Sequence, residues 1–287
     1  MSLGLVMGGG GIVGIAWETG VLAGLREACG FDPTSATVIM GSSAGSVIGA
    51  QAALGRNLDE LVDFQRRPPG SAAAARPAPD FTKGAQGEII QLLMSGRDDV
   101  GARIGALARE ADVDLSEDEF VESFRPMLGT DDWPAVDLRV TSSNCETGQG
   151  VVWSRDSGIG LARAVASSCA IPGFFPTVAF EGRRYMDGPR GKGHTARVLT
   201  EAKVDTALFI GPMAAMAQFS SVMDTELDLV RQQGIDLHAI TGGDGLAAIG
   251  FNLMDVRRRA DGVEAGLADA RAAASAVAEV LAASSSR

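Results

Sequence analysis

The segment Gly41-Ser42-Ser43-Ala44-Gly45, here called the serine turn, constrains the fold of this chain more than any other feature. It follows the apolar run 38–40, which predicts a buried strand, and it leads into a helical pattern over 44–54. The five residues fit Gly-x-Ser-x-Gly, a tight strand-to-helix turn whose flanking glycines leave room for a strained backbone. Such a turn exposes the Ser43 hydroxyl above a helix N-terminus, where amide groups and the helix dipole favour negative charge. An exposed serine in this setting is suited to acyl transfer.

The rest of the chain alternates between strand and helix patterns. Residues 3–7 predict a strand, the glycines of 8–11 form a loop (the glycine loop), and 12–29 predict a helix that Gly30 ends. Two strands joined by a helix make a right-handed parallel unit. Further strands are predicted at 136–142, 150–153, 204–210 and 235–241, a hairpin at 177–186, and helices at 159–168 and 247–281. The pattern predicts a three-layer α/β/α sandwich with a mainly parallel central sheet.

Residues 66–130 interrupt this alternation. The segment opens on a stretch rich in Ala, Pro and Gly, continues with helical patterns at 88–94 and 100–111, and then shows a helix start at Ser116. We interpret it as a mostly helical insertion over one face of the sheet. It is either a lid that gates access of an apolar substrate or a solvent-exposed extension of the fold. The chain is otherwise expected to form one domain over 1–287, with a disordered tail at 284–287.

Composition narrows the functional class. The 287 residues carry a formal net charge of −11, which argues against nucleic acid and against tight binding to strongly anionic membranes. The three cysteines form no close pair and no metal-ligand spacing, so free thiols in a reducing compartment are expected: Cys29, Cys145 and Cys169. There is no secretory signal pattern, and no uninterrupted apolar stretch reaches the roughly 18 residues of a membrane span. These features predict a cytoplasmic protein.

The glycine loop also fits a dinucleotide-binding fingerprint, Gly9-x-Gly11-x-x-Gly14. That function needs an acidic residue at the end of the second strand, where it binds the ribose. Asp32 lies at a suitable distance along the chain, but it precedes the second strand and stands beside Pro33. Because the serine turn occupies the end of that strand, nucleotide binding is the less favoured interpretation.

A Ser-Asp-His triad of the α/β-hydrolase type is another alternative. Both histidines, His194 and His238, follow Ser43, so the chain order serine, acid, histidine is available. In that fold, however, several strands precede the serine turn, whereas the residues before Ser43 have room for two. His194 lies in a Gly- and Lys-rich loop and His238 in a strand-like run, where a structural imidazole is more common. A triad that uses His238 stays as an alternative.

Several motifs in order resemble the signatures of patatin-like lipid acyl hydrolases. They are Gly9-Gly10-Gly11-Ile12-Val13-Gly14, the serine turn, and Asp187-Gly188. The stretch 166–176 (ASSCAIPGFFP), which leads towards Asp187, also resembles the family, and so does 251–255 (FNLMD). The resemblance covers residues 4–56 and 136–270 and leaves the insertion unmatched.

The resemblance implies a serine hydrolase of carboxylic esters, with an acyl lipid or a small ester as substrate. Ser43 would be the nucleophile, and Asp187 would accept its proton without a histidine between them. Three consecutive amides would form the oxyanion hole, those of Gly9, Gly10 and Gly11, and the nucleophile elbow would include Gly41, Ala44 and Gly45. No metal or organic cofactor is implied. The expected partners are the substrate and, transiently, a membrane surface, but no nucleic acid.

Two positions depart from the family pattern. Val13 stands where the family usually carries Arg or Lys, and Pro189 follows Gly188 where the aspartate motif usually ends in Gly or Ala. Loss of the cation is expected to lower activity or to change the preference for anionic head groups, and Pro189 has no N–H to donate. A catalytically weakened family member that acts as a binding or regulatory module is therefore a third alternative.

Overall fold

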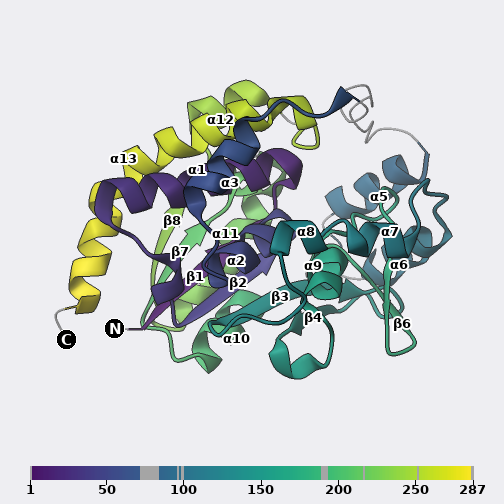
Figure 1. Cartoon of the computed structure of the whole chain (residues 1–287). Helices are drawn as coiled ribbons and strands as arrows, with labels where there is room; N and C mark the ends of the chain where they lie inside the picture. Colours follow the sequence, from purple (N-terminus) through teal and green to yellow (C-terminus); the bar gives the residue numbers. More distant parts are fainter. Residues whose placement is uncertain are drawn as a thin grey trace.

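A mixed sheet organises the part of the chain that the structure describes. This structure is a computed structural model, and it describes residues 2–71, 84–95, 97, 100–188, 193–215, 217–250 and 252–285. The sheet contains eight strands: β1 (Leu3–Met7), β2 (Val38–Ser42), β3 (Asp137–Asn144), β4 (Gly150–Trp153), β5 (Val178–Phe180), β6 (Arg183–Met186), β7 (Thr206–Ile210) and β8 (Asp236–Ile240). Their order is β5-β6-β3-β2-β1-β7-β8, and β4 also pairs with β3 (Figure 1).

The central strands of the sheet are parallel and one side of it is antiparallel. The pairs β3–β2, β2–β1, β1–β7 and β7–β8 run parallel, whereas β4 and β6 pair antiparallel with β3, and β5 pairs antiparallel with β6. The parallel pairing of β1 with β2 and the hairpin of β5 with β6 confirm two predictions made from the sequence. Because parallel strands end at the same edge of a sheet, the residues after β1 and β2 come together there.

Helices cover both faces of this sheet. On one face lie α1 (Gly11–Cys29), α2 (Ala44–Ala53), α9 (Leu161–Cys169) and α13 (Arg259–Ser285), and on the other lie α10 (His194–Glu201) and α11 (Ala217–Gln232). Strand β1 shows why: Leu5 and Met7 belong to the apolar cluster of the first face and Val6 to that of the second, because successive strand side chains point to opposite faces. The predicted three-layer α/β/α sandwich is confirmed.

The long helices α1 and α13 lie side by side along the outer face (Figure 1). Their backbones approach closely, and a Cβ atom at Gly266 would lie 2.0 Å from the Trp17 carbonyl oxygen. The indole N–H of Trp17 donates to Asp269 at 2.7 Å, which fixes the register of the pair. Gly30 caps α1 in the left-handed conformation, as its position in the sequence predicts.

Helices also fill the described part of residues 66–130. They are α3 (Leu58–Arg66), which leads into the segment, α5 (Gly84–Met94), α6 (Gly101–Glu110), α7 (Glu117–Glu122) and α8 (Arg125–Leu128). Each helical pattern predicted here corresponds to a helix, and Ser116 caps α7 in a capping box with Glu119. Ile104 of α6 packs with Cys145 and Met186 in one apolar cluster, so the segment contacts the antiparallel side of the sheet. A lid function stays a prediction.

The C-terminal segment is mainly helical, as the pattern over 247–281 predicts. Its helices are α12 (Asp244–Ile249), which ends at Gly250 (φ +86°), and α13, which begins at Arg259. In the interval, the Leu253 carbonyl accepts a hydrogen bond from the Val13 amide at 2.8 Å, a long-range contact that a local pattern does not reveal. α13 continues through Ser285 and so includes the first two residues of the tail 284–287, whose expected disorder stays a prediction. Residues 286–287 lie outside the described part.

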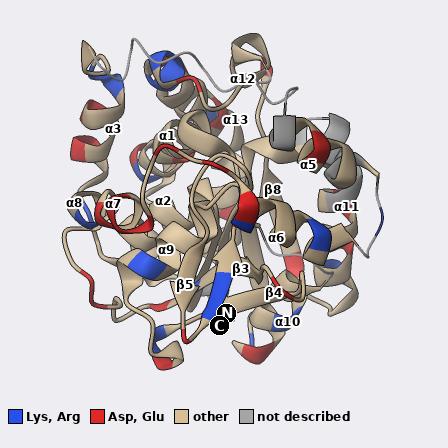
Figure 2. Cartoon of the chain, turned by 90° about the vertical axis from the view of Figure 1, so that its right-hand side faces the viewer, with Lys and Arg blue, Asp and Glu red and all other residues tan. Residues whose placement is uncertain are grey.

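One carboxylate joins α7 to the strands that lead towards Asp187. Glu117 accepts hydrogen bonds from Arg163 (2.8 Å) and from the Ala179 amide (2.9 Å), and its second oxygen accepts one from Arg184 (2.8 Å). Its side chain is only 21% exposed. Figure 2 shows α7 beside α9. Glu117 therefore connects three elements that are distant in sequence.

Replacing Glu117 by Ala is expected to lower the free energy of unfolding by about 1–2 kcal/mol, because charged hydrogen bonds to two partly exposed arginines are lost. Thermal denaturation measures this as a fall of a few degrees in Tm. The matched control is Asp118→Asn, since Asp118 lies in the same first turn but is exposed. An equal fall in Tm for both variants would show that Glu117 acts only through the helix dipole.

Candidate active site

The serine turn has the strained backbone that its sequence predicts. β2 ends at Ser42, α2 begins at Ala44, and Ser43 between them has φ 53° and ψ −121°, a conformation that costs a non-glycine residue free energy. Gly45 packs against the end of β1, and a Cβ atom there would lie 2.3 Å from the Met7 carbonyl group. At Gly41 a Cβ atom would lie 2.4 Å from the Gly45 carbonyl oxygen. Both flanking glycines are therefore required by close backbone contacts.

The backbone of Ser43 is held by side chains from two helices. Its amide donates to the Ser168 hydroxyl at 2.8 Å. Its carbonyl accepts from the Ser46 amide (2.9 Å), the Ser46 hydroxyl (2.7 Å) and the Cys169 thiol (3.3 Å). These bonds offset the strain of the turn and fix the direction of the Ser43 side chain.

The Ser43 hydroxyl meets Asp187, and its oxygen donates to Asp187 Oδ2 at 2.7 Å. Asp187 directly follows β6, where Met186 pairs with Ser143 of β3, and β3 in turn lies beside β2. The Asp187 amide donates to the Ala170 carbonyl at 2.9 Å, and the Ser143 hydroxyl donates to the Gly188 carbonyl. Both side chains of the pair are half-buried. The sheet thus brings together two residues that are 144 positions apart in the chain.

The glycine loop lies beside the same serine. The Gly8 amide donates to the Ile210 carbonyl and the Gly8 carbonyl accepts from the Gly45 amide, both at 2.8 Å, so the loop is tied to β7 and to the serine turn. A Cβ atom at Gly9 would lie 3.6 Å from the Ser43 Cβ atom. Among the described residues, the amides of Gly9, Gly10 and Gly11 have no acceptor. These amides, with the N-terminus of α1, favour negative charge next to Ser43.

Apolar side chains border the glycine loop from two sides. Met213, in the 3-10 turn Pro212–Ala215, places its sulfur 3.4 Å from a Cβ atom at Gly9. Met254, in the interval between α12 and α13, places its sulfur 2.8 Å from a Cβ atom at Gly11. Both methionines are half-buried. The surface beside Ser43 is therefore bordered by thioethers, which adapt readily to apolar ligands.

The residues on which the triad and the nucleotide-binding alternatives depended do not lie beside Ser43. His238 lies on β8, and its Nε2 atom is 3.1 Å from Oδ2 of Asp236 on the same strand. Asp32 precedes β2 and accepts hydrogen bonds from the amide and hydroxyl of Thr34, at 2.9 and 2.8 Å. No acidic residue follows β2 directly, since Ser43 occupies that place.

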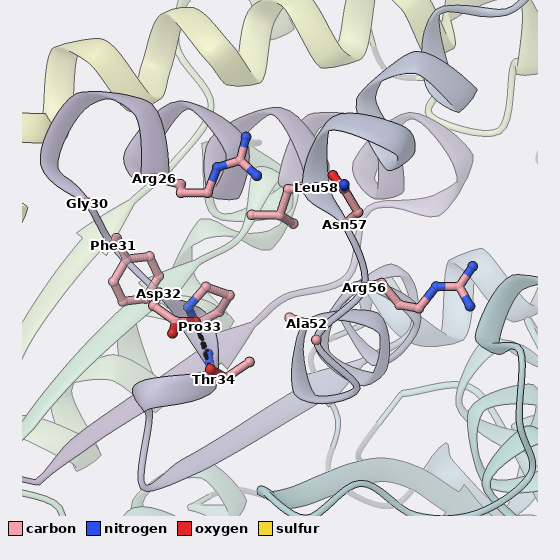
Figure 3. Close-up of a pocket in the computed structure, with 11 residues that line it drawn as sticks. Arg26, Gly30, Phe31, Asp32, Pro33, Thr34, Ala52, Arg56, Asn57 and Leu58 are labelled. Atoms are coloured by element: carbon pink, nitrogen blue, oxygen red, sulfur yellow. Dashed lines mark hydrogen bonds between the residues drawn. The ribbon is translucent and has the colours of Figure 1, made fainter.

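Asp32 borders a hollow of about 500 Å³ at the opposite edge of the sheet, before the start of β2 (Figure 3). Three of the polar side chains around this hollow are engaged within the chain. Arg26 pairs with Asp59, Asp32 binds Thr34, and Asn57 caps α3. These contacts give those three residues structural roles.

The structure also explains one departure from the family pattern. Val13 is fully buried in the apolar cluster between α1 and α13, next to Gly262. A cation at this position would lose its hydration beneath α13, so a valine suits the site. Pro189, the other departure, lies outside the described residues.

Two side chains contact the Ser43 backbone in a way that the sequence does not predict. Ser168 and Cys169 lie in the segment that resembles the family, yet no pattern predicts that they contact Ser43, which is more than a hundred residues earlier. Cys169 was expected to be an ordinary free thiol, and it is free. Burial, and next the charge of Asp187, raise the pKa of this thiol. It therefore contributes to the site as a neutral group.

Comparisons with known proteins found one family model and several solved structures. A family model described as patatin-like phospholipase matches residues 5–189. No curated protein matches the chain. Among solved structures the chain is similar to VipD from Legionella pneumophila, with 14% identity, a TM-score of 0.44, and coverage of 94% of this chain and 67% of that one. It is also similar to the type III effector ExoU, with 16% identity, a TM-score of 0.41, and coverage of 94% and 53%.

A third match is the complex of full-length SpcU with full-length ExoU from Pseudomonas aeruginosa, at 17% identity, a TM-score of 0.34, and coverage of 93% and 53%. The chain thus spans about two thirds of VipD and about half of ExoU. At these TM-scores the likenesses indicate nothing about function. The family model, in contrast, covers well over half of the 287 residues, and the chain therefore belongs to the patatin-like phospholipase family.

Proposed function

We propose that this protein is a serine hydrolase of carboxylic esters that acts on acyl lipids, with Ser43 as nucleophile and Asp187 as proton acceptor. The observation that carries the proposal is the 2.7 Å hydrogen bond from the Ser43 hydroxyl to Asp187. Family membership supports the ester-hydrolase class, and the free amides of the glycine loop support acyl transfer.

In the first step, Ser43 Oγ attacks the carbonyl carbon of the ester while Asp187 takes the hydroxyl proton. The bond from the carbonyl carbon to the leaving oxygen then breaks, and the proton passes from Asp187 to the departing alcohol, which leaves an acyl-serine. In the second step, water attacks the acyl group with Asp187 as base, and Ser43 regains its proton as the fatty acid leaves. The same carboxylate thus serves both half-reactions.

An aspartate is a weak base for an alcohol, since a free aspartate titrates near pH ~4. The oxyanion hole must therefore supply much of the stabilisation, and each well-placed amide contributes about 2.7–4 kcal/mol in the transition state. The amides of Gly9, Gly10 and Gly11 are suited to this role because they carry no side chain and lie beside Ser43.

An acyl chain fits the surroundings of Ser43 better than a polar ligand does. Met213 and Met254 border the glycine loop, and unbranched thioether side chains adapt to flexible hydrocarbon. No helix in the described part of the chain is long and apolar enough to cross a membrane. We infer that contact with a lipid surface is transient and peripheral, and that the helices of 66–130 act as a lid beside the site.

The alternatives are less well supported. A triad would need an imidazole next to Ser43, but His238 is engaged with Asp236 on β8. A weakened binding module was suggested by Val13, whose burial under α13 instead shows that the position has become part of the core. The backbone amides of the oxyanion hole do not depend on that side chain.

Labelling the purified protein with a fluorophosphonate tests the proposal. We expect wild type and Ser42→Ala to react and Ser43→Ala not to react, with the modified peptide containing Ser43. Ser42 is the matched control because it is the adjacent serine, half-buried at the end of β2. Equal labelling of Ser43→Ala would exclude Ser43 as the nucleophile, and full labelling without turnover of any ester would support the binding module.

A further inference from the structure

Glu18 is a buried carboxyl group that the proposed reaction leaves without a role. It lies in the first half of α1, and none of its surface is exposed. Neither of its carboxyl oxygens has a hydrogen-bond partner among the described residues. Because an unpaired carboxylate is costly to bury, this burial raises the pKa of Glu18 well above its usual range.

Its position is the junction between the glycine loop and the serine turn. The carboxyl group faces the Gly8 amide, whose own hydrogen bond goes to Ile210 at 2.8 Å. The carbonyl of the same Gly8 accepts from Gly45, so Gly8 ties the loop to the turn. Glu18 is also close enough to Cys169 for its charge to act on that thiol, which in turn donates to the Ser43 carbonyl.

Few titratable groups surround Glu18. From α9 there is Cys169, and beyond it Asp187, whose charge also acts on the Cys169 thiol. On α13, which packs along α1, Asp269 binds the indole of Trp17, the residue before Glu18, at 2.7 Å, and it does not act on Glu18 itself. The glycine loop and α2 offer only backbone groups and the Ser46 hydroxyl. No Arg, Lys or His in the described part of the chain acts on Glu18. Only the Gly8 amide favours its ionised form, and the effect of burial outweighs that of the amide.

We propose that Glu18 is a positioning residue that acts in its protonated form, as a neutral support behind Gly8 and the serine turn. A neutral carboxyl group fills the junction without adding charge. An ionised Glu18 would instead place negative charge behind the amides that must stabilise an oxyanion. The alkaline limb of the pH–activity profile then reports the ionisation of Glu18. This inference rests on the proposed function.

The conservative variant Glu18→Gln tests the role, because an amide keeps the shape and cannot ionise. We expect its kcat for a p-nitrophenyl ester at neutral pH to stay within about twofold of wild type, and the alkaline limb to disappear. Glu18→Ala leaves a gap beneath Gly8 and should lower kcat at every pH. Cys169→Ser should keep the wild-type alkaline limb. The proposal is overturned if Glu18→Gln keeps the alkaline limb of the wild-type pH–activity profile. It is also overturned if kcat of Glu18→Gln at neutral pH is as low as that of Glu18→Ala.

Thermal denaturation tests the protonation state without any turnover. Glu18 titrates in its usual range in the unfolded chain and above it in the folded protein, so the folded protein binds more protons in the interval between the two pKa values. Wild type should therefore lose stability relative to Glu18→Gln as the pH rises through that interval, and the difference in Tm should then level off. Parallel Tm curves would overturn a neutral Glu18. If the Tm curves of wild type and Glu18→Gln diverge but fluorophosphonate does not label Ser43, the proposed function is wrong. The positioning role of Glu18 is then overturned with it.

Discussion

Replacing Asp187 by Asn is expected to lower kcat for an ester substrate by about 10⁴-fold, the effect of removing the acidic member of a serine hydrolase site. An asparagine at this place keeps the shape and still accepts a hydrogen bond from Ser43, so the nucleophile stays oriented. It cannot take the proton, and the attack on the carbonyl then lacks a base. Because the loss arises in the transition state, KM should change little.

The variant His238→Ala is the control that distinguishes a Ser43–Asp187 dyad from a triad. His238 lies on β8 and contacts Asp236, so its removal should leave kcat close to wild type. Steady-state kinetics and Tm are measured for both variants, since Asp187 also helps to close the end of β6. If His238→Ala were as inactive as Asp187→Asn, the triad would replace the dyad. If Asp187→Asn kept wild-type kcat, Asp187 would have only a structural role.

The sequence predicts the serine turn and the glycine loop well because their geometry is local. A strand that reverses into a helix within one residue needs glycine on both sides, and this requirement is visible in Gly41 and Gly45. The same reasoning located Gly30 at the end of α1 and the helix start at Ser116. In each of these cases the residue that carries the signal acts within its own turn or cap. Gly41 and Gly45 allow close backbone contacts, Gly30 has a positive φ, and Ser116 caps α7 with its side chain.

The contacts that complete the site are not local, and no pattern in the sequence predicts them. Ser168 and Cys169 reach Ser43 only because α9 packs behind the turn. The break between α12 and α13 follows from the contact of Leu253 with Val13 rather than from helix propensity. The signal that could have been noticed is Glu18, a charged residue in the predicted helix 12–29, in a stretch of α1 that the structure buries.

The glycine loop offers a test that separates catalysis from folding. A Cβ atom at Gly9 would lie 3.4 Å from the Met213 sulfur and 3.6 Å from the Ser43 Cβ atom, which are ordinary contact distances. Gly9 is also not one of the glycines with positive φ. At Gly10, in contrast, a Cβ atom would lie 2.5 Å from Pro212 and 2.8 Å from the Gly14 backbone, so something must move.

We therefore expect Gly9→Ala to fold with a Tm at or slightly above that of wild type, because alanine reduces the entropy of the unfolded chain. Its kcat/KM should fall by about 10²–10³-fold, an effect as large as the loss of one oxyanion-hole donor. The alanine amide remains, but its methyl group lies beside Ser43 and Met213 and crowds the space in front of that amide. Gly10→Ala should instead lose stability. Circular dichroism melts and ester hydrolysis distinguish the two variants. Wild-type turnover by Gly9→Ala would show that the oxyanion lies away from this loop.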